Sequence, residues 1–368
     1  MRVSKAQKNV LYALTIAAAV ALTVGLEQWD KDLHRYEGHG FEYMNGYSTT
    51  DFKGYHVYDF PGKLAKLGHK SPFIIKNEAD MPILDGAEAC YPLYSAAAKA
   101  VYKNIAKTEK KYNRIYGDYG YNGKIVTFSN SSKGYERLIR GDVDIFFGAR
   151  PSRKQKEKAA ENGEQIISIP IAKEAFVFFV EKNNPITDIS SDDLRKIYSG
   201  EIKNWSELCD YDKKIIAFQR PENSGSQVMM RFFMGDAKLK APLTYEMGMG
   251  MGDVVTKVAQ YADDEGALAY SFRYFVEELG QEKNVKILSV DGVAPTLENI
   301  ENGTYPILAD LVCAKLESNK KANTDKMIDF MLSEDGKTLI RKTGYAPVKS
   351  GRTEIREITV ITEETTED

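Results

Sequence analysis

From Met81 onward, short apolar segments alternate with segments of helical periodicity, and this alternation limits the fold more than any other feature of the chain. The segments predicted as strands are MPILDG, KIVTFSN, VDIFFGA, IISIPIA, EAFVFFVEK, KIIAFQR, GALAYSF and VKILSV. The segments predicted as helices are YPLYSAAAKAVYKNIAK, SKGYERLIRGD, SSDDLRKIYSG, QVMMRFFM, GDVVTKVAQYADD and TDKMIDFMLSEDGKTLIRKTG. Because such alternation is typical of βαβ units, the sequence predicts an α/β protein with mixed, mostly parallel sheets and flanking helices.

Composition excludes several classes of protein. The 368 residues suggest about two domains, and the hydrophobic content of 43% is enough for sizeable cores. The net charge is -3, with acidic and basic residues interspersed, so no nucleic-acid partner is expected.

Histidine and cysteine are placed where they cannot build the common catalytic or metal sites. All four histidines lie in the first fifth of the chain, at His34, His39, His56 and His69. A Ser-His-Asp site or a histidine metal site in the main body is therefore excluded. The three cysteines, Cys90, Cys209 and Cys313, are far apart and form neither a zinc motif nor a disulfide scaffold. We expect neither enzymatic activity nor a cofactor or metal.

The N-terminal residues 1–28 predict a membrane segment. The run from Val10 to Leu26 has seventeen residues without a charge and follows the basic residues Arg2, Lys5 and Lys8. This pattern predicts a single membrane helix with the body outside the cytoplasm. A cleaved signal peptide is the alternative, because Ala19-Val20-Ala21 resembles a cleavage site, and the body would then be secreted.

Two further segments lack the regular pattern. Residues 29–80 are rich in Gly, Tyr, His and Lys without a sustained period, and they predict an extracytoplasmic stalk before the body. The C-terminal residues 356–368 are acidic and predict a frayed tail.

The loop QRPENSGS joins a predicted strand to a predicted helix and carries the residues of an anion site. The first turn of a helix offers unpaired N–H groups and a partial positive charge. Gly225 would allow an anion to approach the backbone, Ser224 and Ser226 would add hydroxyl donors, and Arg220 would add a guanidinium. The alternative is an N-capping serine followed by a turn glycine.

Two other loops precede helices in the same way, and their small residues are similar. They are DGAEACYP, from Asp85 to Pro92, and the stretch from Asn130 to Gly134. Because strand-to-helix loops meet at one edge of a parallel sheet, the three loops predict one cleft.

From Met81 to Val348 the chain resembles the phosphate-binding proteins of ABC transporters, which have the type 2 periplasmic-binding-protein fold. The resemblance rests on DGAEACYP, SSKGYERLIRGDVDIFFGARPS, ITDISSDDLRKIYSGEIKNWSEL, IIAFQRPENSGSQ, GALAYSF and TGYAPV. It implies two lobes that close on a ligand between them. Lobe I would comprise residues 81–174 and 268–355, and lobe II would comprise residues 175–267.

The resemblance also implies roles for particular residues. Arg220, Ser224, Gly225 and Ser226 match the second-lobe part of an oxyanion site. In the first lobe, Ser131 matches a hydroxyl donor, and Cys90 and Tyr91 stand where the first loop meets the ligand.

The match fails at two positions in the predicted site. Glu88 stands in a loop that normally has only small or hydroxyl residues, and Ala149 stands where the family has Ser or Asp. A carboxylate beside an anion is costly unless it is paired or protonated, so we expect Glu88 to pair with Arg150. The alternative is that Glu88 turns outward.

Two functions from different classes follow. The first is a monomeric, membrane-tethered solute-binding protein that captures an oxyanion, phosphate above all, for the permease of an ABC importer. The second is a binding or interaction module without a transport role, on the same fold, whose phosphate site has changed or been lost. Glu88 and Ala149 favour the second function, whereas the intact RPENSGS loop favours the first.

Overall fold

The computed structural model describes residues 52–116, 123–220, 224–241, 255, 258, 266–279 and 284–358. The apolar run from Val10 to Leu26, most of the helix predicted over 252–264 and most of the acidic tail lie outside these residues. In the part of the chain that is described, none of the helices has the length and apolar character that a membrane crossing requires.

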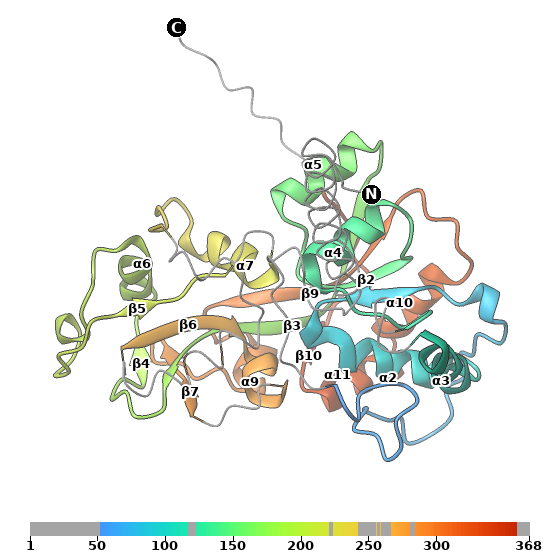
Figure 1. The fold of residues 1–368 in the computed structure, drawn as a ribbon, viewed down its shortest axis with the longest axis horizontal. Helices are drawn as coiled ribbons and strands as arrows, with labels where there is room; N and C mark the ends of the chain where they lie inside the picture. Colours follow the sequence, from blue (N-terminus) through green and yellow to red (C-terminus); the bar gives the residue numbers. More distant parts are fainter. Residues whose placement is uncertain are drawn as a thin grey trace, which may run out of the picture.

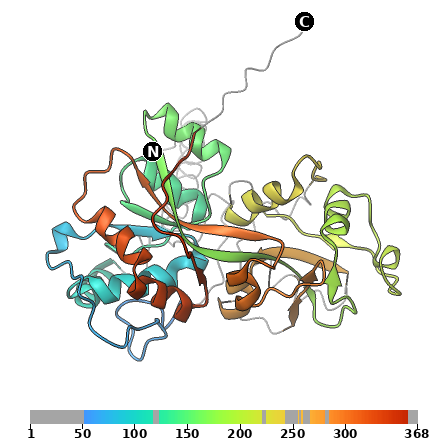
Figure 2. The same cartoon turned by 180° about the vertical axis from the view of Figure 1, so that it is seen from behind.

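Two groups of elements lie side by side, and the long strand β3 (Ile166–Glu181) runs through both (Figure 1). We call the larger group lobe I; its other elements are η2 (Glu78–Asp80), β1 (Leu84–Gly86), η3 (Glu88–Cys90), α2 (Tyr91–Val101), α3 (Ile105–Tyr116), α4 (Asn130–Ile139), β2 (Ile145–Gly148), α5 (Arg153–Glu161), β9 (Leu308–Leu316), α10 (Thr324–Leu332), α11 (Glu334–Thr343), β10 (Ala346–Pro347) and β11 (Ile355–Arg356). The smaller group, lobe II, contains β4 (Asp188–Ile189), α6 (Ser191–Ser199), η4 (Trp205–Glu207), β5 (Ile216–Ala217), α7 (Gly225–Met234), β6 (Ala267–Phe272), β7 (Val285–Ile287) and β8 (Ser289–Val290). The π-helix η6 (Phe275–Leu279) follows β6, and α9 (Leu297–Asn302) packs on β3 and β10. The view from behind shows the same division (Figure 2).

Strand β3 changes partners halfway along its length. Residues Ile166–Ala175 pair with β9 in lobe I, and Phe176–Val180 pair with β6 in lobe II. The main sheet has the order β1-β2-β9-β3-β6-β5, with β7, β10 and β11 also pairing with β3. The junction between Ala175 and Phe176 is therefore the point where the two lobes meet.

The prediction of mostly parallel sheets is incorrect for the described residues, although the α/β class is confirmed. Only β1–β2, β5–β6 and β4–β8 are parallel, and every described pair that includes β3 or β9 is antiparallel. The reason is that β3 runs from lobe I to lobe II, whereas its neighbours β6 and β9 run in the opposite direction. A pattern of alternating elements does not reveal such crossings between lobes.

Several element boundaries also differ from the sequence predictions. IISIPIA and EAFVFFVEK form one strand, with a register shift between Pro170 and Ala172 that accommodates the missing proline N–H. The two longest predicted helices are each divided, into α2 and α3 and into α10 and α11. The helix predicted at SSDDLRKIYSG is confirmed as α6, with the Ser190 side chain accepting a hydrogen bond from the N–H of Asp193.

The return to lobe I occurs later in the chain than residue 268. Strand β6 pairs with the lobe II half of β3, β7 pairs with Phe179–Glu181, and β8 pairs with β4. The chain re-enters the lobe I sheet at β9. Strands β6, β7 and β8 therefore belong with the lobe II sheet, whereas the resemblance placed the chain from residue 268 onward in lobe I.

The segment predicted as a stalk is packed onto lobe I from Phe52 onward. Phe52, Val57, Leu64 and Ile75 are buried in the same core as α2. The Phe52 ring packs against Tyr91, with ring centroids 4.9 Å apart, and the N–H of Ile75 donates to the carbonyl of Val101 at 2.8 Å. In both views this segment lies along α2 and α11 (Figures 1 and 2).

Removing residues 1–80 is therefore expected to destabilise the body by at least about 3 kcal/mol compared with a chain that begins at Phe52. Burying one large apolar side chain contributes roughly 1.5–3 kcal/mol, and the shorter chain loses four of them. Urea unfolding of the two truncated chains measures the difference. Equal midpoints and equal slopes would show that the segment only lies against the body.

Candidate functional site

A small, partly open cavity lies where β3 changes partners between the lobes. Its volume is about 30 Å³, counted as the space that the centre of a water molecule can occupy. This is room for only a few atoms beyond a single water. The lining residues come from both lobes and are mostly small: Ala87, Ala89, Cys90, Ser131, Gly148, Ala149, Glu174, Gly225, Phe272, Ala309, Asp310, Leu311 and Tyr345.

The two lobes touch at this cavity through Gly225, the first residue of α7. A Cβ atom added at Gly225 would lie 3.1 Å from Ser131 Oγ and 3.5 Å from the Cβ of Ala149. Ser131 is the second residue of α4, so the N-terminal ends of α4 and α7 face the same space from opposite lobes. Each end carries a partial positive charge and unpaired N–H groups, which suit a small anion.

The loop before α7 uses its two serines differently. Ser224 is the N-cap, and its side chain accepts a hydrogen bond from the N–H of Gln227 at 3.2 Å, as the alternative interpretation of this loop expected. Ser226 is completely buried in the first turn, and its Oγ makes no hydrogen bond to any described residue. A buried hydroxyl without a partner is uncommon, and it marks Ser226 as a candidate ligand donor.

Arg220 is buried, but it is not among the residues that line the cavity. Its backbone N–H is held by the hydroxyl of Tyr270 at 3.0 Å and by Gln227 Oε1 at 3.2 Å. The Tyr270 hydroxyl also donates to Gln227 Oε1. Together these hydrogen bonds connect β6, α7 and Arg220, which follows β5. This network fixes the backbone from which the Arg220 side chain leaves.

A buried ion pair fixes the lobe I side of the cavity. Asp85, at the end of β1, is fully buried and pairs with Arg137 of α4. The same carboxylate accepts hydrogen bonds from the Ser129 hydroxyl at 2.5 Å and from the N–H of Gly86 at 2.8 Å. Burial raises the pKa of Asp85, and the Arg137 guanidinium opposes this shift. The pair thus connects the first loop to the start of α4.

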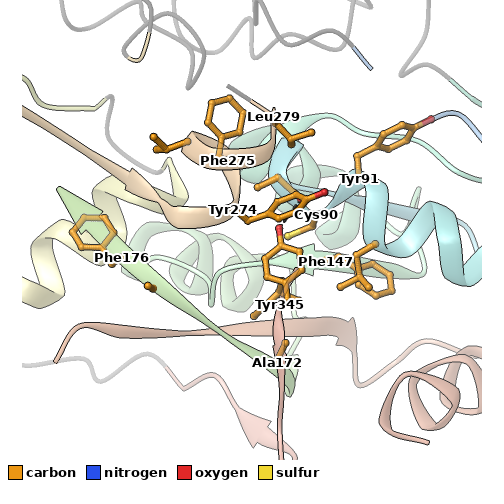
Figure 3. Packing of buried hydrophobic residues seen from close by; sticks show 14 of the residues in the cluster. Cys90, Tyr91, Phe147, Ala172, Phe176, Tyr274, Phe275, Leu279 and Tyr345 are labelled. Atoms are coloured by element: carbon orange, nitrogen blue, oxygen red, sulfur yellow. Dashed lines mark hydrogen bonds between the residues drawn. The ribbon is translucent and has the colours of Figure 1, made fainter. Parts of the chain in front are cut away.

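The first loop brings Cys90 to the cavity but turns Tyr91 away. Figure 3 shows Cys90 beside Tyr274 and Tyr345, with Tyr91 on its other side. The Tyr91 hydroxyl is 2.7 Å from His56 Nδ1 in the packed N-terminal segment, so Tyr91 is a core residue in this structure. Burial raises the pKa of the Cys90 thiol, which disfavours the reactive thiolate.

The expected pair between Glu88 and Arg150 does not form. Arg150 donates from Nε and Nη2 to the two carboxylate oxygens of Glu357, at 2.8 and 3.0 Å. Glu357 follows β11, and β11 pairs with the lobe I half of β3. This pairing places the Glu357 carboxylate beside Arg150, so Arg150 pairs with Glu357 and not with Glu88. Glu88 does not turn outward either, since it is buried within η3.

Two acidic residues from the crossing strands, Glu174 and Asp310, line the cavity, and neither was predicted as a site residue. Glu174 of β3 lies 3.7 Å from the Nε of Arg273, and its oxygens accept hydrogen bonds from the N–H groups of Ala175 and Tyr274. Burial nevertheless raises the pKa of Glu174 to about 7. Asp310 of β9 pairs with Lys173 at 2.6 Å. The available signal was Glu174 itself, which stands directly before six apolar residues in the predicted strand EAFVFFVEK.

The structure thus brings together Cys90, Ser131 and Gly225 around one space, and Ser226, which follows Gly225 in α7, is buried without lining it. Arg150 and Tyr91 lie elsewhere. The polar groups are hydroxyls, helix-end N–H groups and two partnered carboxylates, which can bind a small ligand without a covalent step. Among the described residues, no three His, Cys, Asp or Glu side chains are grouped to hold a metal ion.

Comparison with known proteins places this geometry in a family. The phosphate-binding protein PstS of Bacillus subtilis is 29% identical over 269 residues, which cover 72% of this chain and 80% of that protein. Protein SphX of Synechococcus elongatus is 26% identical over 281 residues, covering 72% and 76% of the two chains. The solved structure of a Clostridium perfringens protein, named as a candidate phosphate ABC transporter substrate-binding protein with bound phosphate, shares the fold. It has a TM-score of 0.54 and 23% identity, and the match covers 73% of this chain and 100% of that one.

A family model also matches this chain. The model of the PBP superfamily domain matches residues 79–335, a range that contains the crossing strand β3 and the first turn of α7. Because the match spans well over half of the sequence, this chain belongs to the PBP superfamily.

Proposed function

We propose that this protein is an extracytoplasmic solute-binding protein that captures a small oxyanion, inorganic phosphate above all, and delivers it to an ABC importer. It acts as a monomer, held at the membrane by residues 1–28. The anion lies between the lobes, where helix-end N–H groups and hydroxyls replace its water shell. No covalent chemistry is involved.

The observation that carries this proposal is the meeting of α4 and α7 at the cavity. Gly225 brings the backbone of one lobe within contact distance of Ser131 in the other, and Ser226 is buried beside it with its hydroxyl unsatisfied by the described residues. An anion between the two helix ends would contact both partial positive charges at once. The Bacillus subtilis relative is a phosphate-binding protein and the Clostridium perfringens structure holds bound phosphate, which supports the same ligand.

The carboxylates at the cavity are compatible with a bound anion because the negative charge of each is reduced, either by a paired cation or by protonation. Asp310 is paired with Lys173, and Glu174 faces Arg273 with a pKa of about 7, so much of its population is neutral at neutral pH. The alternative function, a module without a phosphate site, has less support because Ser131, Gly225 and Ser226 keep their places. Glu88 and Ala149 remain departures from the family pattern.

Exchanging Arg220 for alanine is expected to weaken phosphate binding by at least about tenfold. A charge-assisted hydrogen bond contributes roughly 1.5–3 kcal/mol, and 1.4 kcal/mol corresponds to a factor of ten. Equilibrium dialysis with labelled phosphate measures the affinity. The matched control is Arg231→Ala, an exposed arginine on α7, which should bind as the parent does.

The two serines provide a second contrast at the same site. Ser226→Ala should weaken phosphate binding with little change in stability, whereas Ser224→Ala should lower stability by about 1 kcal/mol through loss of the N-cap. If Arg220→Ala and Ser226→Ala both bind phosphate normally, the site is not at the start of α7 and the proposed function loses its structural basis.

A further inference from the structure

A second space adjoins the small cavity and is about ten times larger. Counted in the same way, its volume is about 330 Å³, which falls within the range of small-molecule pockets. We call it the interlobe groove. Lobe II contributes Val228, Met229 and Phe232 of α7, and lobe I contributes Arg150, Lys156 and Glu357.

The groove and the cavity share part of their lining. Ala149, Ala309 and Asp310 line both of them, and the side chains of the two alanines end at Cβ. The lobes are already in contact at Gly225, one turn before Val228. The groove is therefore the space left between α7 and lobe I beyond the N-terminal end of α7, where the two lobes come closest.

The walls of the groove are of two kinds. On the α7 side they are apolar, and Phe232 is 78% exposed although it is a large aromatic residue. On the lobe I side, Arg150 forms its ion pair with Glu357, and Lys156 lies 4.0 Å from the same carboxylate. The lining of the groove also includes Asp310, so its cationic and anionic side chains are equal in number and this wall has no net charge. The apolar side suits an organic group, while an attached phosphate would stay in the cavity.

We propose that the site accepts phosphate monoesters of small alcohols, with the phosphate in the cavity and the organic group in the interlobe groove against Val228, Met229 and Phe232. This inference rests on the proposed function and extends it from inorganic phosphate to a class of substituted phosphates. The ester oxygen would leave the cavity past these two alanines, whose short side chains line both spaces. A site completely enclosed around four phosphate oxygens would reject these ligands.

Calorimetric titration of the full chain in detergent, with inorganic phosphate and with n-propyl phosphate, tests the proposal. In the parent, propyl phosphate should bind at least as tightly as inorganic phosphate, because the propyl group leaves water on entering the groove. Met229→Trp fills the groove without touching the cavity lining. It should weaken propyl phosphate at least tenfold and leave the affinity for inorganic phosphate within twofold.

Two further variants keep the test independent of the fold of Met229→Trp. Phe232→Ser removes the apolar wall and should weaken propyl phosphate only, whereas Phe60→Ser, at an exposed phenylalanine of lobe I, should change neither ligand. Binding of inorganic phosphate without propyl phosphate would overturn this inference and leave the proposed function intact. Equal binding of propyl phosphate by the parent, Met229→Trp and Phe232→Ser would overturn the role of the groove. Binding of neither ligand would overturn both proposals.

Discussion

Replacing Arg137 with methionine is expected to lower the free energy of unfolding by about 3–5 kcal/mol, the usual cost of removing one partner of a buried ion pair. The variant leaves the Asp85 carboxylate fully buried without its countercharge. It also removes the hydrogen bond from the guanidinium to Thr127 Oγ1, at 3.0 Å. Urea denaturation of the parent and the variant measures the loss.

Arg140 on the same helix provides the matched control. It pairs with Glu136 and Asp142 at the surface, so Arg140→Met should cost less than about 1 kcal/mol. Combining Arg137→Met with Asp85→Asn removes both charges, and stability should recover to within about 2 kcal/mol of the parent. Equal losses for Arg137→Met and Arg140→Met would contradict the account of a buried pair that joins the first loop to α4.

The second large effect is expected at Glu174 and depends on pH. Its folded pKa of about 7 lies above the ordinary value of 4.5, so the fold favours the protonated form. The stabilisation that protonated Glu174 contributes to the fold is fully present below pH 4.5 and is lost as the pH rises through 7. A difference of about 2.5 pKa units corresponds to about 3 kcal/mol.

Glu174→Gln removes this titration while keeping a side chain of the same size. The free energy of unfolding of the variant, minus that of the parent, should therefore rise by about 3 kcal/mol between pH 4.5 and pH 8. Chemical denaturation at several pH values gives the difference directly, because the other titrating groups are common to both proteins. A difference that stays constant with pH would show that Glu174 is charged throughout and held by Arg273.

Local patterns predicted local structure well. Helices α4, α6 and α7 were expected from local sequence patterns, and Ser131 of α4 and Gly225 of α7 line one cavity. Such features depend on a few neighbouring residues, so the sequence contains the necessary information. Ser131 and Gly225 could be chosen for this reason.

Contacts between segments that are distant in the sequence could not be predicted from such local patterns. Whether Arg150 pairs with Glu88 or with Glu357 depends on where β11 adds to β3, and Glu357 lies 207 positions after Arg150 in the chain. Glu174 was overlooked because its strand resembles a buried strand, although a charged residue in such a strand is costly unless it has a partner. The packing of residues 52–75 likewise depends on Tyr91 and Phe128, not on any period within the segment.

Calorimetric titration of the full chain with inorganic phosphate tests the central claim most directly, with chloride at equal ionic strength as the control. The account predicts saturable binding of one phosphate per chain, with a Kd well below about 1 mM, since two or three charge-assisted bonds contribute more than about 4 kcal/mol. The Arg220→Ala variant should bind at least about tenfold more weakly under the same conditions. No saturable heat from phosphate up to about 10 mM, roughly tenfold above that limit, would contradict the account.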